Sequence, residues 1–336
     1  MMRQICLFFF LLIGLLSYGQ DIHFSQYFLS PLSYNPANTG DINEDFRVAG
    51  NFRTQWRAID KPYQSTGVSF DQQTIFKNRL FNVGAYFVND QSGDGRLNIN
   101  KFLLSGGYNH SFMGVNWSGG IQAGLVSKSL SKDNLTFPDQ FNMATGTFDP
   151  SLATGDQNLL ANLNFLDVNL GFSAAKKVTE KLFAKAHVGL FHVNYPKESF
   201  LNEINRLPMR TMWSTQGVYQ LPTKSKVALN ILSMYHAKAK ESVWNAMYLV
   251  PVNPDKMKVK EVFGGLSYRD GLVRNNDSFI LNIGSVYKNY TIGVSYDVNV
   301  SDLRASTKMR GALEIAIIYK SLNSLTFGKG LPCERF

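Results

Sequence analysis

The sequence predicts an all-β fold, a transmembrane antiparallel β-barrel of about 14 strands. Three observations indicate this fold. In residues 290–300 every second residue is apolar, and a tilted strand of about 10 residues with one apolar face is the element that crosses a bilayer in a closed barrel. The same alternation recurs along the chain. It follows an N-terminal segment typical of exported proteins.

The N-terminus predicts a cleaved secretory signal peptide over residues 1–19. Arg3 supplies positive charge, residues 5–16 form an apolar run, and residues 17–19 read Ser-Tyr-Gly, a small-x-small cleavage site. The run is shorter than the roughly 20 apolar residues of a spanning helix. We therefore expect Sec export, a mature chain that starts at Gln20, and a location in the bacterial outer membrane.

The composition fits a barrel. Hydrophobic residues make up 44% of the chain, and the mean hydropathy of −0.14 suits strands that are polar on one face. The net charge of +9 is spread along the chain. This charge suggests anionic lipid headgroups or an acidic partner, and it gives no nucleic-acid footprint. Cys6 belongs to the expected signal peptide, so Cys333 is left without an intramolecular disulfide partner.

Alternation between turn signals predicts the strands in order along the chain. The expected strands cover residues 46–57, 63–71, 80–90, 98–112, 115–127, 163–176, 181–193, 208–220, 225–237, 242–250, 260–269, 277–287, 289–300 and 310–321. An even number is typical of single-chain bacterial barrels and places both chain ends on the periplasmic side. Residues 46–336 are therefore expected to form the barrel.

The first expected strand separates its side chains clearly by face. Placing Arg or Lys at the bilayer midplane costs roughly 2 to 4 kcal/mol each, so its arginines must face the lumen or the rim. The apolar face carries Phe46, Val48, Phe52 and Trp56, and the polar face carries Arg47, Asn51, Arg53, Gln55 and Arg57.

The connections between strands predict an orientation, because such barrels have short periplasmic turns and longer outer loops. The outward connections include the long ones, at about 128–162, 194–207 and 301–309. Several inward connections are tight, namely 113–114, 177–180, 221–224 and 288–289, while 72–79 and 251–259 are of medium length. The loop at about 128–162 is long enough to be functional, as a plug in the lumen or as a docking surface.

Residues 20–45 are expected to form an N-terminal periplasmic extension or a plug. The Asn35-Pro36 pair sets a turn, because the residue before proline avoids the helical region. The aromatic side chains of Tyr27, Phe28 and Tyr34 need an apolar surface on which to pack.

Motifs of catalysis and of metal or cofactor binding are missing, so the sequence predicts a protein that is not an enzyme. His187 and His192 lie on one expected strand and would face opposite sides, so they cannot form one metal site by themselves. Residues 90–95 match the first half of a calcium loop. Lys101 stands where that loop needs its bidentate acid, so a hairpin turn is the better interpretation.

The order of several short motifs resembles the PorP/SprF family of Bacteroidetes outer-membrane proteins, which is associated with type IX secretion and gliding motility. The resemblance spans essentially the whole mature chain. It rests on Phe24-Ser25-Gln26, on Asn35-Pro36-Ala37 followed by Gly40, on Arg53, Gln55 and Trp56, and on Asp71, Asp90, Gly95 and Asp297. The last strand departs from the family pattern, since residues 311–314 read Gly-Ala-Leu-Glu where a Gly-x-His-Glu type sequence is expected.

The resemblance implies a barrel without catalytic activity or cofactor. Such a barrel would dock or anchor secreted surface proteins, often adhesins, through their type IX C-terminal domains. Its other partners would be outer-membrane lipid and periplasmic components of the type IX machinery. The motif residues would then be structural or would bind partners.

Two other readings stay open. The barrel could be a porin-like solute channel whose lumen is made basic by Arg47, Arg53 and Arg57. Alternatively, the chain could be a soluble secreted β-sandwich, although strands of about 10 to 12 residues argue against that fold. The content of the lumen separates anchoring from transport. A plug made of 20–45 and the 128–162 loop favours anchoring, and an open polar bore favours transport.

Overall fold

The computed structural model describes residues 22–58, 61–76, 79–93, 97–131, 135, 137–149, 151–152, 161–200, 205–252, 258–271 and 276–321. The expected signal peptide over 1–19, the motif residue Gly95 and the lone Cys333 lie outside the described residues. Among the described residues, no helix is both long enough and apolar enough to cross a bilayer.

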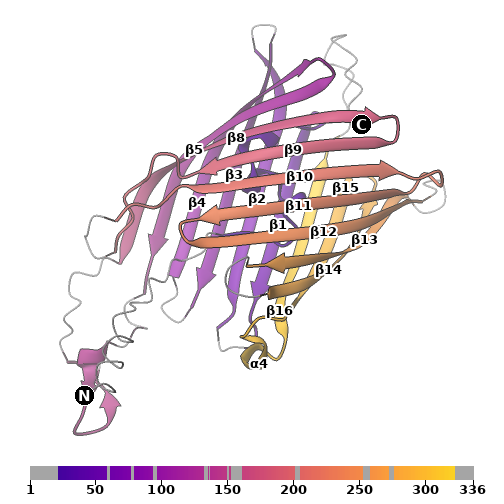
Figure 1. Ribbon diagram of the computed structural model, residues 1–336. Coiled ribbons are helices and arrows are strands. Elements are labelled where there is room, and N and C mark those ends of the chain that lie inside the picture. Colours follow the sequence, from indigo (N-terminus) through magenta and orange to yellow (C-terminus); the bar gives the residue numbers. More distant parts are fainter. Residues whose placement is uncertain are drawn as a thin grey trace, which may run out of the picture.

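In this part of the chain 14 antiparallel strands form a closed barrel (Figure 1), and the predicted fold class is confirmed. Each strand pairs with its neighbours along the chain, and β1 closes the cylinder by pairing with β16. The barrel strands are β1 Phe46–Gln55, β2 Tyr63–Phe76, β3 Arg79–Ser92, β4 Leu97–Phe112, β5 Val115–Ser129, β8 Asn162–Thr179, β9 Leu182–Phe191, β10 Arg210–Gln220, β11 Lys226–His236, β12 Ala239–Pro251, β13 Val259–Asp270, β14 Asn276–Tyr287, β15 Tyr290–Asn299 and β16 Arg310–Lys320.

Most predicted strand ends agree with these bounds to within a few residues, but the expected medium-length connection at 72–79 is wrong. β2 continues to Phe76 and β3 begins at Arg79, so only residues 77–78 separate the two strands. Gln72 and Gln73 look like loop residues because they are polar. In the barrel they pair with Val83 and Asn82, which satisfies their backbone groups without an apolar face.

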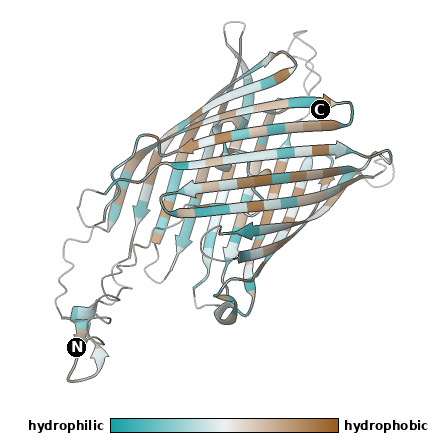
Figure 2. Cartoon of the chain, in the orientation of Figure 1, coloured by the Kyte–Doolittle hydropathy of each residue, from teal (hydrophilic) through white to brown (hydrophobic). Residues whose placement is uncertain are grey.

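The period-two pattern decides which side chains meet lipid. Apolar side chains such as Leu125, which is 66% exposed, point outward from the strands. The residues between them are polar and buried, for example Asn282 and Asp297. In Figure 2 brown and teal segments therefore follow each other along single strands. A closed barrel leaves no unpaired backbone edge in the bilayer, which is the condition for a sheet to span it.

The predicted faces of the first strand are confirmed for its middle. Phe52 is 41% exposed, whereas Arg47, Asn51 and Arg53 are buried. Trp56 is an exception, because β1 ends at the residue before it and Trp56 has a left-handed φ of 58°.

The two ends of the barrel differ in their connections. At one end, named the short-turn rim, brief turns join β2 to β3, β4 to β5, β8 to β9, β10 to β11 and β14 to β15, while the connection from β12 to β13, residues 252–258, has the expected medium length. At the other end, named the long-loop rim, lie the β5–β8, β9–β10 and β15–β16 connections, the last with the helix α4 Arg304–Thr307. General barrel architecture would place the short-turn rim in the periplasm.

The described part of the β5–β8 connection forms a small unit of its own. It contains the 3-10 helix η4 Pro138–Gln140 and a two-stranded hairpin, β6 Phe141–Asn142 and β7 Thr147–Phe148. In Figure 1 this magenta hairpin lies beyond the barrel at the lower left. The described part of this loop therefore does not fill the lumen.

The lumen is instead occupied by residues 22–42, which we name the lumenal segment. The segment contains three short helical turns, η1 Tyr27–Leu29, α2 Pro31–Tyr34 and η2 Pro36–Asn38. Its contacts reach strands on all sides of the barrel, from β4, β5, β8 and β9 to β16. Each of the three apolar clusters of the lumen contains residues of this segment, packed against inward apolar residues of the wall.

Candidate functional site

The lumenal segment runs along the inside of the barrel from the long-loop rim toward the short-turn rim. Ser25 contacts β15 and β16 near their long-loop ends, whereas Asp41 meets Lys185 near the start of β9 at the opposite end. The chain then enters β1 at Phe46. The segment therefore passes through most of the lumen before the barrel begins.

Apolar side chains of the segment organise three small cores against inward residues of the wall. Phe24 and Leu32 pack on β3 and β4, Tyr27 packs on β9 to β12, and Leu29 packs on β1, β11 to β13 and β16. Tyr27 also meets Tyr34 edge to face, with 5.6 Å between the ring centroids. The aromatic residues of the segment thus have the apolar surface that the sequence requires for them.

A row of glycines in the wall makes room for the segment. Gly107 pairs with Gly120 across β4 and β5, Gly120 pairs with Gly171 on β8, and Gly171 pairs with Gly189 on β9. A Cβ atom at Gly120 would lie 2.2 Å from the carbonyl oxygen of Pro36. Since no real Cβ approaches a backbone oxygen so closely, the inner wall is shaped to the backbone of the lumenal segment.

Asn35 fastens the segment to this glycine row. Its side-chain amide donates to the carbonyl oxygens of Phe172 at 3.2 Å and Val188 at 3.1 Å, which belong to β8 and β9. Its side-chain oxygen accepts from the amide of Ala37 at 2.7 Å and closes the turn before η2. A Cβ atom on Gly171 would lie 2.2 Å from that same side-chain oxygen.

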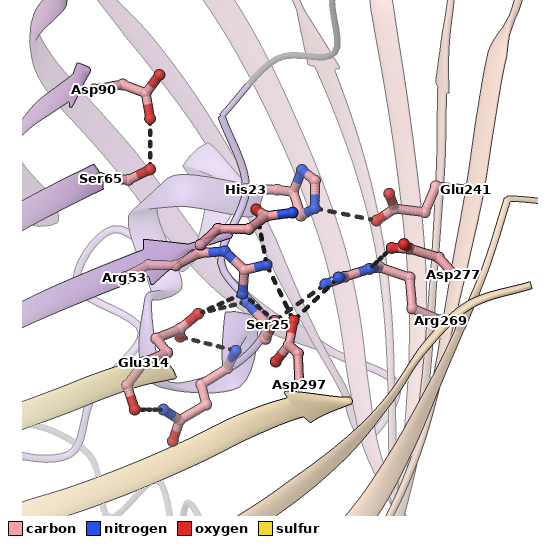
Figure 3. A network of polar contacts seen from close by, with 12 residues as sticks. His23, Ser25, Arg53, Ser65, Asp90, Glu241, Arg269, Asp277, Asp297 and Glu314 are labelled. Atoms are coloured by element: carbon pink, nitrogen blue, oxygen red, sulfur yellow. Dashed lines mark hydrogen bonds and ion pairs between the residues drawn. The ribbon is translucent and has the colours of Figure 1, made fainter. Parts of the chain in front are cut away.

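A buried network of ions holds the other end of the segment (Figure 3). The Glu314 carboxylate accepts from the backbone amides of Ser25 at 2.7 Å and Gln26 at 2.9 Å. The Ser25 hydroxyl donates to Asp297 at 2.9 Å and accepts from both Arg53 and Arg269.

The two guanidinium groups balance the carboxylates of this network. Asp297 lies 3.0 Å from Arg53 and 3.0 Å from Arg269, while Glu314 lies 3.4 Å from Arg53. Arg269 also pairs with Asp277 on β14. The network joins β1, β13, β14, β15 and β16, including both strands of the seam where the barrel closes. Removing one partner would leave a buried charge without compensation.

A second ion pair fixes the segment near the short-turn rim. Arg47 on β1 contacts Asp71 on β2 at 2.8 Å and donates to the carbonyl oxygen of Asn38 at 2.9 Å. Asp71 in turn accepts from the amide of Gly40 at 2.8 Å. Gly40 has a left-handed φ of 63° and packs against Asn82, so a side chain would fit poorly there.

Most of the motif residues singled out from the sequence meet in this site. The segment itself contributes Phe24, Ser25, Gln26, Asn35, Pro36, Ala37 and Gly40, and the wall contributes Arg53, Asp71 and Asp297. Gln55 accepts from Arg53 at 3.2 Å at the margin of the network. Trp56 and Asp90 lie apart from it. Trp56 stacks edge to face with Tyr63 at 5.0 Å, and Asp90 accepts from Ser65.

Sequence reasoning missed two central members of the network, Glu314 and Arg269. A signal was present, because Glu314 is an acid on the inward face of a strand whose other face is apolar. The expectation that His187 and His192 lie on one strand and face opposite sides is wrong, since β9 ends at Phe191, His192 follows it with a φ of 60°, and both side chains are buried. His192 Nδ1 lies 2.7 Å from the buried Asp167 carboxylate.

The contacts of this site hold the lumenal segment in place inside the barrel. In the described ranges, no cluster of three or more His, Cys, Asp or Glu side chains could hold a metal ion. The charged groups of the network pair with each other and with the backbone of the segment. Such an arrangement holds a polypeptide in one position.

Comparisons with known proteins agree with this architecture. A family model described as "Type IX secretion system membrane protein PorP/SprF" matches residues 16–319. A search of curated proteins found no match.

Solved structures with a similar fold include the Ralstonia pickettii toluene transporter TbuX. It has 14% identity and a TM-score of 0.51, and the match covers 86% of this chain and 92% of that one. The Pseudomonas putida toluene transporter TodX has 12% identity and a TM-score of 0.51, with 90% and 94% covered. A TodX deltaS2S3 mutant, described as a monoaromatic hydrocarbon channel, has 11% identity and a TM-score of 0.53, with 89% and 95% covered. At such identities the likeness shows the outer-membrane barrel fold alone.

Proposed function

This chain belongs to the PorP/SprF family of type IX secretion system membrane proteins, and we propose that it is a non-enzymatic outer-membrane barrel that docks or anchors secreted surface proteins, such as adhesins, through their C-terminal domains. The observation that carries the proposal is the occupied lumen. The wall glycines are fitted to the backbone of residues 22–42, so the barrel is built around its own segment instead of around a passing solute.

A barrel with an occupied lumen has to engage large partners from outside. Its strands form a closed ring, so the wall has no free edge to which a client strand could be added. The β6–β7 hairpin has only two strands, and it exposes Phe141, Met143 and Phe148, of which Met143 is 91% exposed. Exposed apolar side chains on a strand pair suit both surface docking and strand addition.

The remaining parts of the proposal follow from the family and from the export signal. Sec export and cleavage after residue 19 would deliver the chain to the outer membrane, where the long-loop rim would face outward. The short-turn rim would then meet periplasmic components of the type IX system. The proposal includes a role in gliding motility, in which the client would be an adhesin on the cell surface.

A solute channel is the competing function, and it is favoured by the similar structures, which include toluene transporters. Those proteins share the fold at 11 to 14% identity, which does not extend to substrate. In this chain, transport would require the lumenal segment to leave its buried ion pairs and its glycine row. The proposal therefore expects a closed barrel in planar bilayers.

Affinity purification of the tagged protein from outer membranes, followed by mass spectrometry, tests the proposal. We expect one large secreted protein to be recovered together with type IX components. Deleting about residues 135–158 should leave heat-modifiable migration intact and reduce the recovered client severalfold. The matched control is Met113→Ala, which alters another exposed methionine, at the short-turn rim. A barrel purified without a client that conducts ions steadily would reject docking in favour of transport.

A further inference from the structure

A polar cavity of about 270 Å³ lies inside the barrel at the short-turn rim. Its inner side is formed by the end of the lumenal segment, from Asp41 to Asn43. Inward lysines reach it from three strands, Lys177 from β8, Lys185 from β9 and Lys320 from β16. At about 30 Å³ for each water molecule, the cavity has room for a few polar side chains.

The lining of the cavity combines positive charge with neutral hydrogen-bonding groups. Asn116 and Ser118 on β5 and Gln216 on β10 complete its polar wall. The strands around it are paired without interruption, so the cavity is separated from the bilayer on all sides. An occupant therefore has to come along the barrel axis from the short-turn side, because the lumenal segment closes the other direction.

Carboxylates of the rim are already engaged by the inward lysines. Lys185 pairs with Asp41, Lys320 lies 3.4 Å from Glu44, and Lys177 lies 2.9 Å from Glu180. On β11 and β13, Lys226 and Glu261 form a similar pair at 3.3 Å. Because these carboxylates are already paired, they do not neutralise the other lysines at this rim.

Six further lysines at the same rim are exposed, and none of them forms an ion pair with a described carboxylate. Turn geometry does not explain them, because three have left-handed φ values, where glycine or asparagine would cost less. The three are Lys224 at 65°, Lys258 at 57° and Lys288 at 51°. The whole set is Lys176, Lys181, Lys224, Lys258, Lys260 and Lys288.

We propose that the short-turn rim is a basic vestibule that binds an acidic segment of a periplasmic protein, with one or two of its carboxylates entering the cavity beside Lys177 and Lys320. The exposed turn lysines steer the segment to the mouth, and the amide and hydroxyl groups of the wall accept and donate within it. The inference rests on the proposed function for the periplasmic placement of this rim.

The geometry favours a polypeptide over anionic lipid. Lipid headgroups could meet Lys176 and Lys260, which lie on strands and point outward, but they cannot enter a cavity enclosed by paired strands. A flexible acidic loop or tail can reach the turn lysines and the cavity together. The turn lysines and the cavity can bind the same partner only if that partner is a polypeptide.

The test uses the full-length protein in neutral phosphatidylcholine nanodiscs and a fluorescein-labelled oligoglutamate peptide of about ten residues, with oligoglutamine of the same length as the uncharged control. Fluorescence anisotropy reports binding. Exposed ion pairs contribute about 0.2 to 1 kcal/mol each, so the triple reversal Lys181→Glu, Lys224→Glu and Lys288→Glu should weaken binding about tenfold or more. The matched control reverses three exposed lysines of the long-loop rim, Lys197, Lys238 and Lys308.

A second pair of variants addresses the cavity. Ser118→Trp fills it from β5 and should weaken oligoglutamate binding severalfold, while Thr215→Trp places the same ring on the exposed, outward face of β10 and should not. Raising the salt from about 0.05 to 0.5 M should weaken binding to the wild type as the charges are screened.

Three results would overturn the inference. The first is an equal loss of peptide affinity in both triple variants, and the second is unchanged peptide binding in Ser118→Trp. The third is binding of the protein to phosphatidylglycerol vesicles with no binding to the peptide, which would assign the lysines to lipid. Client recovery from cells is measured independently. Loss of client recovery with intact peptide binding would reject the docking function alone, and loss of peptide binding with intact client recovery would reject the vestibule alone.

Discussion

Replacing Arg53 by methionine should unseat the outer end of the lumenal segment while the barrel stays folded. Arg53 is 3% exposed. It contacts the Ser25 hydroxyl, lies 3.0 Å from Asp297 and lies 3.4 Å from Glu314. Methionine keeps much of the length of the side chain and removes its charge, so the change tests the ion pairs with little change in volume.

The cost follows from what remains after the substitution. Asp297 still has Arg269 at 3.0 Å, but Glu314 loses its cation and keeps only the two backbone amides of the segment. Breaking a buried ion pair by removing one partner costs about 3 to 5 kcal/mol. Admitting water to Glu314 relieves that cost, and this requires only Ser25 and Gln26 to move. Asn35 and Arg47 hold the rest of the segment.

Thiol labelling measures this movement directly. A Ser25→Cys reporter in a Cys333→Ser background should react with a maleimide about 100-fold faster when Arg53 is methionine, because about 3 kcal/mol corresponds to two powers of ten in an opening equilibrium. The control is Arg57→Met, which removes an exposed arginine just beyond the end of β1.

A different result would refute this reasoning. If labelling in Arg53→Met is no faster than in Arg57→Met while the heat-modifiable transition falls by many degrees, the barrel seam has yielded and the segment has not. The network would then serve barrel closure, and the lumenal segment would be held by its apolar contacts and the glycine row.

Two more predictions probe the wall. Gly120→Leu places a side chain against the carbonyl oxygen of Pro36, which a Cβ atom would approach to 2.2 Å. Overpacking of this kind costs about 1 to 3 kcal/mol or more, so the lumenal segment should be displaced and the conductance of the barrel should rise. The control is Gly119→Leu, which has open space at its Cβ and should leave the barrel closed. Equal conductance in both variants would count against the fitted groove. Ile292→Arg puts a charge on the lipid face at a cost of about 2 to 4 kcal/mol. The amount of folded, heat-modifiable barrel in outer membranes should fall in this variant and should not fall in Ile292→Leu. Normal assembly of the arginine variant would reject the assigned lipid face.

Part of the site could be read in advance. Arg53 and Asp297 stood out because each is a charged residue on the polar face of an alternating strand, and that pattern requires only neighbouring residues. Asn35 was predicted as a turn residue because proline follows it, and Gly40 was singled out only through the family resemblance. Glu314 was not predicted as a site residue, because the partners of an inward acid on the last strand lie on β1 and in the lumenal segment, far away in the sequence. The contact between His192 and Asp167 was not predicted, because His192 lies past the end of β9 in a backbone conformation that alternation does not predict.

The sequence by itself determined the strands, the faces of each strand and the barrel, because a period of two is a local property and lipid outside imposes it on every strand. Only the tertiary structure decided what fills the barrel. Ser25 reaches Asp297 across 272 positions and Glu314 across 289, and the four wall glycines meet the segment only after four strands have paired in register. Contacts between residues so far apart produce no periodic pattern in the sequence, so the contacts that hold the lumenal segment are seen only in the closed barrel.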